Sequence, residues 1–555
     1  MEKLLNITVG EMLETTAAKY PTNLAIKYIE VNYKRTYYQF NAEVDEYARG
    51  LLGMGIKAGD HVAVWATNYP EWIILFFATA KIGAVLVTVN TNYKEAELEY
   101  LLSNSDSKAL FICDGIKDID CEKIIYSVCP ELKNCKPGEL NNEKLPFLKY
   151  VVSFDNWYEG MFHWSQVPHF GVLISDEEFQ KVKDAVKPDD VVNMQYTSGT
   201  TGFPKGVMLT HNNIVNNGLA IGDCMKFTEK DKLCIPVPFF HCFGMVLAIM
   251  ASVTHGTAMV PLLWYTPMKV MHAIEYEKCT AVHGVPTMYI RMLEHRDFHR
   301  YDFSSLRTGI MAGSPCPIKV MQDVIEKMNM KEITITYGQT EASPACTMTT
   351  TDETLEHRVA TVGKELPFME TKIVDAETGE DVPNGTPGEF VVRGYNVMKG
   401  YYKMPEATAA AIDKDGWLHT GDIAVKDDDG YYKITGRLKD MIIRGGENIF
   451  PKEIEDFIYT HPDVVDVQIV AVPSENLGEE AYAFVTKRPG SSVTPKDIQN
   501  YVKNNMARHK VPSYVEFIDK MPMTASGKIQ KFVLRDMAKK TLGIENNNFV
   551  FKDNK

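Results

Sequence analysis

The sequence predicts an α/β protein built from a large N-terminal domain and a small C-terminal domain. The first observation is the length, because 555 residues are too many for one hydrophobic core. The second is an alternation of short apolar runs with amphipathic segments, which is typical of parallel or mixed sheets covered by helices. The third is a change after residue 440 to a compact mixture of helices and strands.

Helices and strands alternate along the N-terminal part of the chain. Apolar residues at helical spacing predict the helices, and short apolar runs such as HVAVW at His61–Trp65 predict the strands. The expected order is a helix and a strand within 9–29, a helix at 37–52, a strand at 61–65, a helix at 72–84, and strands at 84–89 and 109–112. Residues 114–185 are polar and dotted with proline, so we expect an irregular elaboration there.

The same alternation resumes after this elaboration and continues to residue 337. The expected elements are a helix at 212–225, a strand at 232–237, a buried helix at 244–253, and strands at 280–282, 308–312 and 333–337. From 371 to 402 the chain changes to short strands separated by glycine and proline turns, which predicts a β-rich subdomain.

Residues 441–555 are expected to form a compact, mobile α+β domain. Pro451 stands at the start of an amphipathic helix that buries Ile454. The expected elements after it are strands at 464–472 and 481–486, a helix at 494–506, a strand at 514–518 and a closing helix at 529–542. We therefore expect an N-terminal domain at 1–436, a hinge at 437–440, and the C-terminal domain after it.

The composition is that of an ordinary globular protein, with 45% apolar and 24% charged residues. The net charge of −14 argues against nucleic-acid binding, so an anionic substrate must be held by local basic groups. No apolar segment is long and clean enough to span a membrane, and the N-terminus shows no signal or transit pattern. Ten cysteines without CxxC or metal spacing indicate reduced thiols and a cytoplasmic location.

The stretch YTSGTTGFPKGVMLTH at 196–211 carries the strongest functional signal. Glycines let a loop turn its N–H groups toward an anion, hydroxyls add donors, and a lysine adds positive charge. The loop follows an apolar run and precedes a helix expected from 212, so we expect the strand–loop–helix setting of phosphate sites. The expected phosphate-binding residues are Thr197, Ser198, Gly199, Thr200, Thr201, Gly202, Phe203, Pro204 and Lys205.

Together with YGQTE, VWATNYPEW, KDMIIRGGENIFP and SGKIQKF, this string resembles the signature of the adenylate-forming (AMP-binding) enzymes. That superfamily contains acyl-CoA synthetases, luciferases and the adenylation domains of peptide synthetases. The resemblance covers about residues 10–542 and is closest to medium-chain acyl-CoA synthetases of the family-member-2 type. It implies ATP and CoA as co-substrates and Mg²⁺ as the cation.

The YGQTE segment is expected to hold part of the ATP. By resemblance, Tyr337 covers the adenine, Thr340 bonds the α-phosphate, and Glu341 holds Mg²⁺. A carboxylate is a hard oxygen ligand, as Mg²⁺ prefers. Gly338 and Gln339 complete this part of the nucleotide site.

Three further segments complete the implied ATP site. The small residues that the resemblance places against the adenine are Gly313, Ser314 and Pro315. Asp422 is expected to bond the ribose hydroxyls, with Arg437 as support, because a carboxylate offers the acceptors that a cis-diol needs. Lys528 is expected to stabilise the charge that develops as the acyl-adenylate forms.

The acyl and CoA groups are expected at other loops. The resemblance implies that His241 lines or gates the carboxylate site, that Gly284 and Val285 lie near the carboxylate, and that Gly445 and Gly446 meet the pantetheine arm. The candidate walls of the acyl pocket are His241, Phe243, Met245, Val285, Met311 and Tyr337.

The resemblance also implies that the small domain turns between two half-reactions, with Lys439 at the hinge. Several relatives carry arginine where this chain has Asn448 and Leu477. The side chains that would contact the 3′-phosphate of CoA are therefore left open.

The sequence thus predicts an ATP-dependent fatty acid–CoA ligase that forms acyl-AMP and then acyl-CoA, with a small carboxylic acid, ATP and CoA as partners. The segment after PFF has no acidic residue to pair with an amino group, so an uncharged acyl tail is expected. The alternatives are an adenylation domain that loads a carrier protein, a luciferase-like oxygenase, and a catalytically inactive ligand sensor. The acyl chain length is left open, as is the choice between monomer and homodimer.

Overall fold

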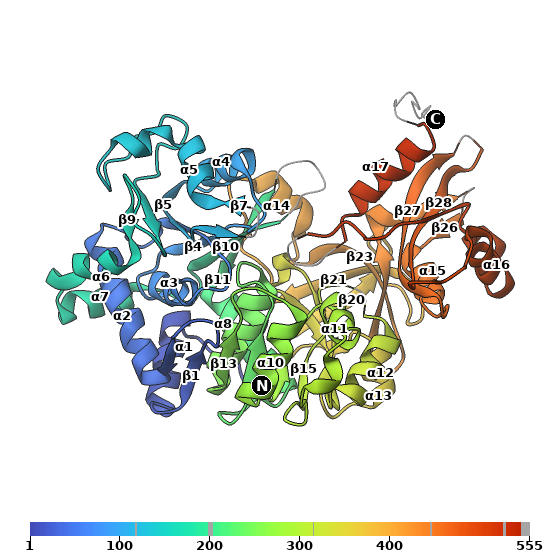
Figure 1. The fold of residues 1–555 in the computed structure, drawn as a ribbon, viewed down its shortest axis with the longest axis horizontal. Helices are drawn as coiled ribbons and strands as arrows, with labels where there is room; N and C mark the ends of the chain where they lie inside the picture. The colour runs from blue at the N-terminus through green and yellow to red at the C-terminus, as the bar shows by residue number, and fades with distance from the viewer. Residues whose placement is uncertain are drawn as a thin grey trace. The chain divides into compact units, whose positions relative to one another are not determined.

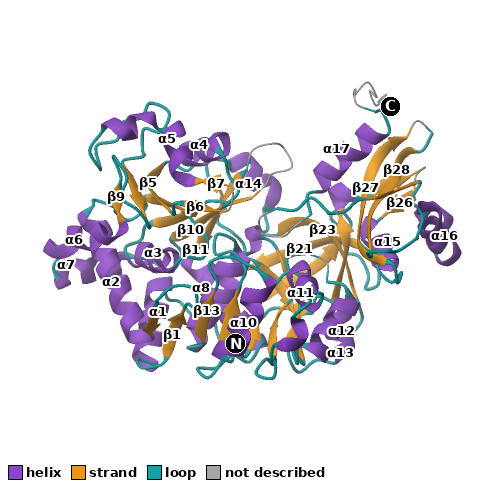
Figure 2. Ribbon diagram, viewed as in Figure 1, coloured by secondary structure: helices purple, strands orange, loops and turns teal. Residues whose placement is uncertain are grey.

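The computed structural model describes residues 1–116, 119–197, 204–314, 316–444, 447–474, 476–524 and 529–544. The chain forms two compact units. Unit 1 is Met1–Thr371 with Val391–His419, and unit 2 is Lys372–Phe390 with Thr420–Lys555. Sheets flanked by helices confirm the predicted α/β class (Figures 1 and 2). The expected hinge at 437–440 concerns movement and stays a prediction.

Unit 1 contains a seven-stranded sheet in the order β16-β15-β14-β12-β13-β1-β2. Its strands are β1 (Leu24–Lys27), β2 (Lys34–Thr36), β12 (Lys232–Ile235), β13 (Ala258–Pro261), β14 (Ala281–Val282), β15 (Thr308–Ile310) and β16 (Glu332–Thr334). All neighbours pair in parallel except β1 and β2. Ligand sites of such sheets lie at the carboxyl ends of the strands.

A second sheet of unit 1 has eight strands in the order β22-β11-β10-β4-β3-β5-β8-β9. Its strands are β3 (His61–Trp65), β4 (Val85–Thr88), β5 (Ser107–Ile112), β8 (Tyr150–Ser153), β9 (Phe162–His163), β10 (Val191–Thr197), β11 (Lys205–Thr210) and β22 (Gly400–Tyr401). The pairs from β10 to β9 are parallel, whereas β11 is antiparallel to β10 and to β22. The sheet is therefore mixed, as predicted.

Helices of unit 1 follow most of the predicted positions. The predicted positions hold α1 (Val9–Lys19), α2 (Tyr37–Gly53), α3 (Pro70–Lys81) and α8 (His211–Cys224). No prediction covers α4 (Glu95–Asn104), α10 (Pro267–Glu277), α11 (Pro286–Leu293) or α12 (Ile318–Lys327). The predicted buried helix at 244–253 is a π-helix, η4 (Phe243–Met250), followed by α9 (Ala251–His255). π-Helical turns are rare and are often found at functional sites.

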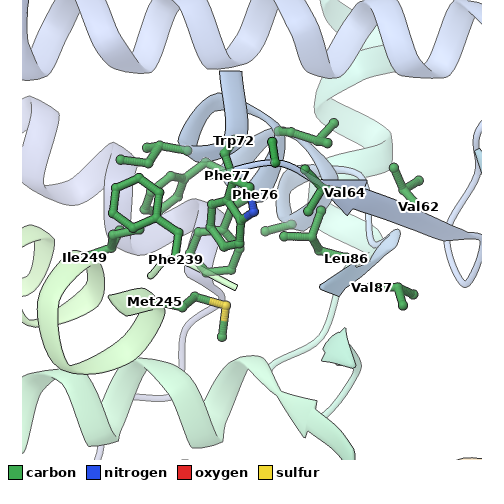
Figure 3. Close-up of a cluster of buried hydrophobic side chains, with 14 of the residues drawn as sticks. Val62, Val64, Trp72, Phe76, Phe77, Leu86, Val87, Phe239, Met245 and Ile249 are labelled. Atoms are coloured by element: carbon green, nitrogen blue, oxygen red, sulfur yellow. The ribbon is translucent and has the colours of Figure 1, made fainter. Parts of the chain in front are cut away.

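The core of unit 1 is packed around α3, of which every residue except Glu71 is buried. Figure 3 shows its aromatic side chains clustered with Phe239 and Met245. The ring centroids of Trp72 and Phe239 are 5.4 Å apart. Removing one such buried aromatic side chain typically destabilises a protein by about 3–5 kcal/mol. The segment 238–245, which was predicted to carry acyl-site residues, is thus part of the core.

Two predictions for residues 1–212 are wrong. Residues 114–185 are not irregular, because β8 joins the eight-stranded sheet and α5 (Cys121–Val128) and α7 (Asp176–Ala185) form helices. The side chain of Ser175 caps α7 by accepting the N–H of Glu178. The expected strand–loop–helix at 191–212 is instead a hairpin, because β11 pairs with β10 before α8 begins.

Unit 2 includes two sheets. The first sheet has the order β20 (Met369–Val374), β21 (Gly388–Gly394), β23 (Leu418–Lys426) and β24 (Tyr432–Arg437). The boundary between the units falls within each of the first three of these strands. The second sheet contains β25 (Ile442–Arg444), β26 (Glu447–Ile449), β27 (Val464–Ser474), β28 (Gly478–Lys487) and β29 (Tyr514–Phe517). The helices are α15 (Pro451–Ile458), α16 (Pro495–Asn505) and α17 (Lys531–Thr541). Its buried residues after 441 form cores of their own, which confirms the predicted α+β character.

Other expectations concern thiols and membranes. All ten cysteines are free, and seven of them are buried. Among the described residues, no helix has the length and apolar character needed to cross a membrane. Lys81, the last residue of the apolar helix α3, is buried, and its ammonium lies 2.5 Å from Asp45 and 3.0 Å from Glu14.

Glu71, in the first turn of α3, is a poorly solvated carboxyl group. Its buried Oε2 has no hydrogen-bond partner among the described residues. Burial, with smaller repulsion from Asp155 and Glu43, raises the pKa of Glu71 to about 7. The folded protein therefore favours the protonated carboxyl, and ionisation above that pH opposes folding.

We predict that Glu71→Gln stabilises the protein at pH 8 by about 1–3 kcal/mol, because the amide cannot ionise. Below pH 4.5, the ordinary glutamate pKa, both folded and unfolded wild-type chains carry the proton, so the difference should disappear there. The measurement is the thermal unfolding midpoint between pH 4 and 8, with exposed Glu139→Gln as control. An equal effect of Glu71→Gln at both ends of the range would contradict the raised pKa.

Candidate active site

The segment predicted as one strand at 333–337 divides between two sheets. Its first part belongs to β16, whereas β17 (Thr336–Gly338) pairs with β18 (Ala345–Met348). The change occurs at Ile335, whose N–H donates to Thr349 Oγ1 at 3.0 Å and whose carbonyl accepts the Thr349 N–H at 2.9 Å. The YGQTE segment therefore leaves the parallel sheet at the carboxyl end of β16.

The end of the YGQTE segment lies in a tight turn. A Cβ on Gly338 would lie 1.8 Å from the carbonyl oxygen of Pro344. The same oxygen accepts the N–H of Gln339 at 2.9 Å, and the N–H of Ala342 donates to the Gln339 carbonyl at 2.8 Å. The turn leads directly into the short helix η6 (Thr340–Ala342), which carries Thr340 and Glu341.

The carboxylate of Glu341 meets a side chain that sequence reasoning missed. The Tyr401 hydroxyl donates to Glu341 Oε1 at 2.9 Å, and the ammonium of Lys205 lies 4.6 Å from the centroid of the Tyr401 ring. Burial and the Glu341 charge both raise the pKa of Tyr401 well above its usual value. Tyr401 thus contacts both Lys205 and Glu341, which the sequence predicts to lie in the ATP site.

Tyr401 reaches this place because β22 adds to the edge of the eight-stranded sheet. Tyr401 lies opposite Val207 in the ladder, and the N–H of Tyr402 donates to the Gly206 carbonyl at 2.8 Å. A two-residue strand has no hydrophobic period, so no signal in the sequence marks Tyr401 as part of the site.

The residues predicted near the adenine and the acyl carboxylate also come together. Gly313 has a φ of +86°, and a Cβ there would lie 3.2 Å from Val285 Cγ1 and 3.8 Å from the Phe243 ring. Gly284 forms a bridge with Met311, and its carbonyl accepts the Ala312 N–H at 3.3 Å. Of the predicted adenine loop, Ser314 follows Gly313 directly, while Pro315 lies outside the described residues.

Two histidines, His241 and His283, lie near these residues in unit 1. His241 is half-buried, and its Nδ1 accepts the N–H of Phe243 at 3.2 Å. The fully buried His283 accepts the Ile310 N–H at Nδ1, at 3.2 Å, and donates from Nε2 to the Leu247 carbonyl at 3.0 Å. Burial lowers the pKa of His283 to about 4, so the imidazole is neutral. Its two hydrogen bonds connect η4 with β15.

Within unit 2 the predicted ribose residues pair across a hairpin. Asp422 and Arg437 are opposite in the β23–β24 ladder, and Arg437 Nε lies 2.7 Å from Asp422 Oδ1. The Asp422 side chain is 3% exposed and that of Arg437 is 47% exposed. The hairpin thus pairs a nearly buried carboxylate with an exposed guanidinium, and the role of Asp422 with ribose stays a prediction.

Lys439 lies in the short helix η7 (Leu438–Asp440), beside Asp440, which forms an ion pair with Arg535 of α17. Desolvation of its side chain, followed by the charge of Arg437, lowers the pKa of Lys439. Although its ammonium is partly desolvated, Lys439 as a whole residue is exposed. Exposure does not distinguish a hinge from an ordinary turn.

Several predicted residues lie outside the described residues. They are Ser198, Gly199, Thr200, Thr201, Gly202, Phe203, Gly445, Gly446 and Lys528. The ends of the segment with Lys528 are described: Met523 bridges to Ile529, and the Lys531 ammonium lies 2.8 Å from the buried Glu455 carboxylate.

The candidate site fits a Mg²⁺ ion that is shared with a substrate. Within the described ranges, no group of three or more His, Cys, Asp or Glu side chains could hold a metal ion by itself. Glu341 offers one oriented carboxylate, bonded to the same Tyr401 whose ring contacts the Lys205 ammonium. Mg²⁺ is usually held in this way, by one or two carboxylates together with phosphate oxygens and water.

Comparison with known proteins gives consistent matches over nearly the whole chain. Residues 13–402 match the AMP-binding enzyme family, and residues 453–528 match the AMP-binding enzyme C-terminal domain. The Bacillus subtilis (strain 168) protein YngI, which carries the name of an acyl-CoA synthetase, is 54% identical over 97% of this chain and 98% of its own. The Mus musculus protein named medium-chain acyl-CoA ligase ACSF2, mitochondrial, is 40% identical over 97% of this chain and 89% of its own.

A solved structure agrees with these matches. The ATP-bound MatB from Rhodopseudomonas palustris has a TM-score of 0.80 and 28% sequence identity. The match covers 98% of this chain and 100% of that chain.

We predict that Gly338→Ala lowers the free energy of unfolding by about 1–3 kcal/mol and weakens ATP binding. The added methyl group would collide with the Pro344 carbonyl oxygen, which the Gln339 N–H holds in place. Denaturant unfolding and nucleotide titration would measure the two effects. The control is Gly436→Ala, where the nearest atom, on Phe450, is 3.4 Å away. Unchanged values for both quantities in Gly338→Ala would show that the turn is not rigid.

Proposed function

The chain belongs to the AMP-binding enzyme family and is an acyl-CoA synthetase, and we propose that it joins medium-chain fatty acids to CoA. The observation that carries the proposal is the gathering of Lys205 and Glu341 at Tyr401, where ATP phosphates and their cation would bind. The name of the Mus musculus relative supports the preference for medium chains.

In the proposed first half-reaction, a fatty carboxylate oxygen attacks the α-phosphorus of ATP. The bond to the leaving pyrophosphate breaks, and acyl-AMP forms. Lys205 and the hydroxyl of Thr340 would contact phosphate oxygens, and Lys528 would approach the α-phosphate as charge develops there. Mg²⁺, held by Glu341, would neutralise phosphate charge when bound.

The remaining ATP contacts are proposed from the same resemblance. Tyr337 would cover the adenine, with Gly313 allowing the close approach of a flat ring because it carries no Cβ. Asp422 would accept hydrogen bonds from the ribose hydroxyls, beside its ion pair with Arg437.

In the proposed second half-reaction, the CoA sulfur attacks the acyl carbonyl carbon, the bond to AMP breaks, and the thiol proton is released. Gly445 and Gly446 would approach the pantetheine arm, and the C-terminal domain at 441–555 would turn about Lys439 between the two steps. The ion pair between Asp440 and Arg535 supports a rigid connection from this turn to α17.

The acyl tail is proposed to bind among apolar side chains of unit 1. His241, Gly284 and Val285 would surround the carboxylate end. The segment from Cys242 through η4 contains no acidic residue, which disfavours an amino-acid substrate. A carrier-protein loading domain and a luciferase-like oxygenase are the alternatives. The ten free cysteines support a reducing compartment, and we propose the cytoplasm.

We predict that kcat/KM rises about fourfold for each added methylene until the pocket is full, then falls, with the maximum at medium-length straight-chain acids. The measurement is CoA-dependent release of AMP across acids from acetate to long chains, with amino acids and aromatic acids in the same series. A flat series, or an amino acid as the best substrate, would refute the proposed specificity. AMP release that requires a carrier protein instead of CoA would favour the alternative.

We predict that Lys528→Ala slows acyl-adenylate formation by about 10²- to 10³-fold but spares thioester formation from supplied acyl-AMP. The reason is that the ammonium would act only on the charge that develops at the α-phosphate. Each half-reaction is measured separately, with the exposed Lys520→Ala as control. Equal losses in both half-reactions would contradict this role.

A further inference from the structure

Tyr401 touches both charged groups of the candidate site at the same time. Its hydroxyl donates to Glu341 Oε1 at 2.9 Å, while the Lys205 ammonium lies over the ring, 4.6 Å from its centroid. Tyr401 is buried, and Lys205 and Glu341 are half-buried. The cation therefore contacts the face of the ring, and the anion contacts its hydroxyl end.

These two charges present a physical difficulty for an ATP site. A lysine and a glutamate that lie close together in a partly buried place attract one another strongly. A direct ion pair would occupy the ammonium needed by phosphate and the carboxylate needed by a divalent cation. Within the part of the chain that the structure describes, no ion pair joins Lys205 to Glu341.

The adjacent tyrosine provides a comparison within the same unit. The Tyr402 hydroxyl donates to Asp106 at 2.9 Å, and the Lys403 ammonium lies 5.2 Å from the Tyr402 ring centroid. Here the lysine and the carboxylate do pair directly, at 2.6 Å. A similar set of three side chains thus forms an ion pair at Tyr402 and none at Tyr401.

We propose that Tyr401 is a positioning residue that keeps Lys205 and Glu341 apart until ATP and its cation bind. The ring face attracts an ammonium and the hydroxyl bonds a carboxylate, so each charged group has a partner that is weaker than a full opposite charge. Phosphate oxygens and Mg²⁺ can then replace Tyr401 at both groups. This inference rests on the proposed use of MgATP.

The backbone around Tyr401 is held firmly enough for this role. Its N–H donates to Thr408 Oγ1 at 2.9 Å, and it lies opposite Val207 in the β11–β22 ladder. Lys205 begins the same strand β11. The backbone that carries the ring is therefore hydrogen-bonded to the strand that carries the lysine.

The test is ATP affinity measured by calorimetry without acid or CoA, once in EDTA and once with saturating Mg²⁺. Tyr401→Phe keeps the ring and removes the hydroxyl. We expect its gain in affinity from Mg²⁺ to fall about tenfold, while its affinity in EDTA stays at the wild-type value. Tyr401→Leu removes the separating ring as well, so its affinity in EDTA should also fall about tenfold.

Two further variants separate positioning from simple damage. In Tyr401→Leu with Glu341→Gln, the lysine has no carboxylate to pair with, so affinity in EDTA should return toward the wild-type value. A folding defect would not be corrected by that second change. Tyr402→Phe is the matched control, and both of its affinities should equal those of the wild type.

The outcomes decide the proposal. An unchanged Mg²⁺ effect in Tyr401→Phe, or no recovery in the double variant, would overturn the positioning role while wild-type ATP binding still upholds the proposed function. A wild-type protein that binds no ATP would overturn both. Wild-type ATP binding without CoA-dependent turnover would reject the acyl-CoA assignment alone, because the calorimetric comparison uses neither acid nor CoA.

Discussion

The pairing of β22 with β11 is the constraint on which the candidate site depends. It joins Gly400 and Tyr401 to the strand that begins with Lys205, and it brings a buried hydroxyl to Glu341. This short ladder thus supplies the side chain that both charged residues contact. A few backbone hydrogen bonds at a sheet edge therefore place the ring and hydroxyl that contact Lys205 and Glu341.

The rest of unit 1 forms a rigid apolar support for this edge. The aromatic side chains of α3 pack against Phe239, and the nearby Asn68 accepts the Phe239 N–H and donates to the Val237 carbonyl. His283 is held neutral between η4 and β15. The polar side chains here bond to backbone groups of neighbouring segments. The surrounding core is otherwise apolar, which suits an uncharged acyl tail better than a charged one.

Periodicity predicted most of the fold, because strands such as His61–Trp65 and helices such as α2 carry clear patterns. It failed at 114–185, where short elements are separated by polar connections, and at Lys205–Thr210, where a glycine-rich string precedes the strand. Asp422 and Arg437 could be related from the sequence because the resemblance implies that both serve the ribose, and the structure pairs them across a hairpin. Tyr401 could not be found, since its contacts come from residues far away along the chain.

The discontinuity of unit 1 has a consequence for the newly made chain. Lys205 and Glu341 leave the ribosome well before Tyr401. Between Glu341 and Tyr401 the chain enters unit 2 at Lys372 and returns to unit 1 at Val391. At about 5–20 residues per second, the roughly 200 residues from Lys205 to Tyr401 take about 10–40 seconds to synthesise. During that interval β11 has an open edge that a strand of another nascent chain could pair with. Slow synthesis of this stretch would therefore expose the edge of the strand that carries Lys205 for longer.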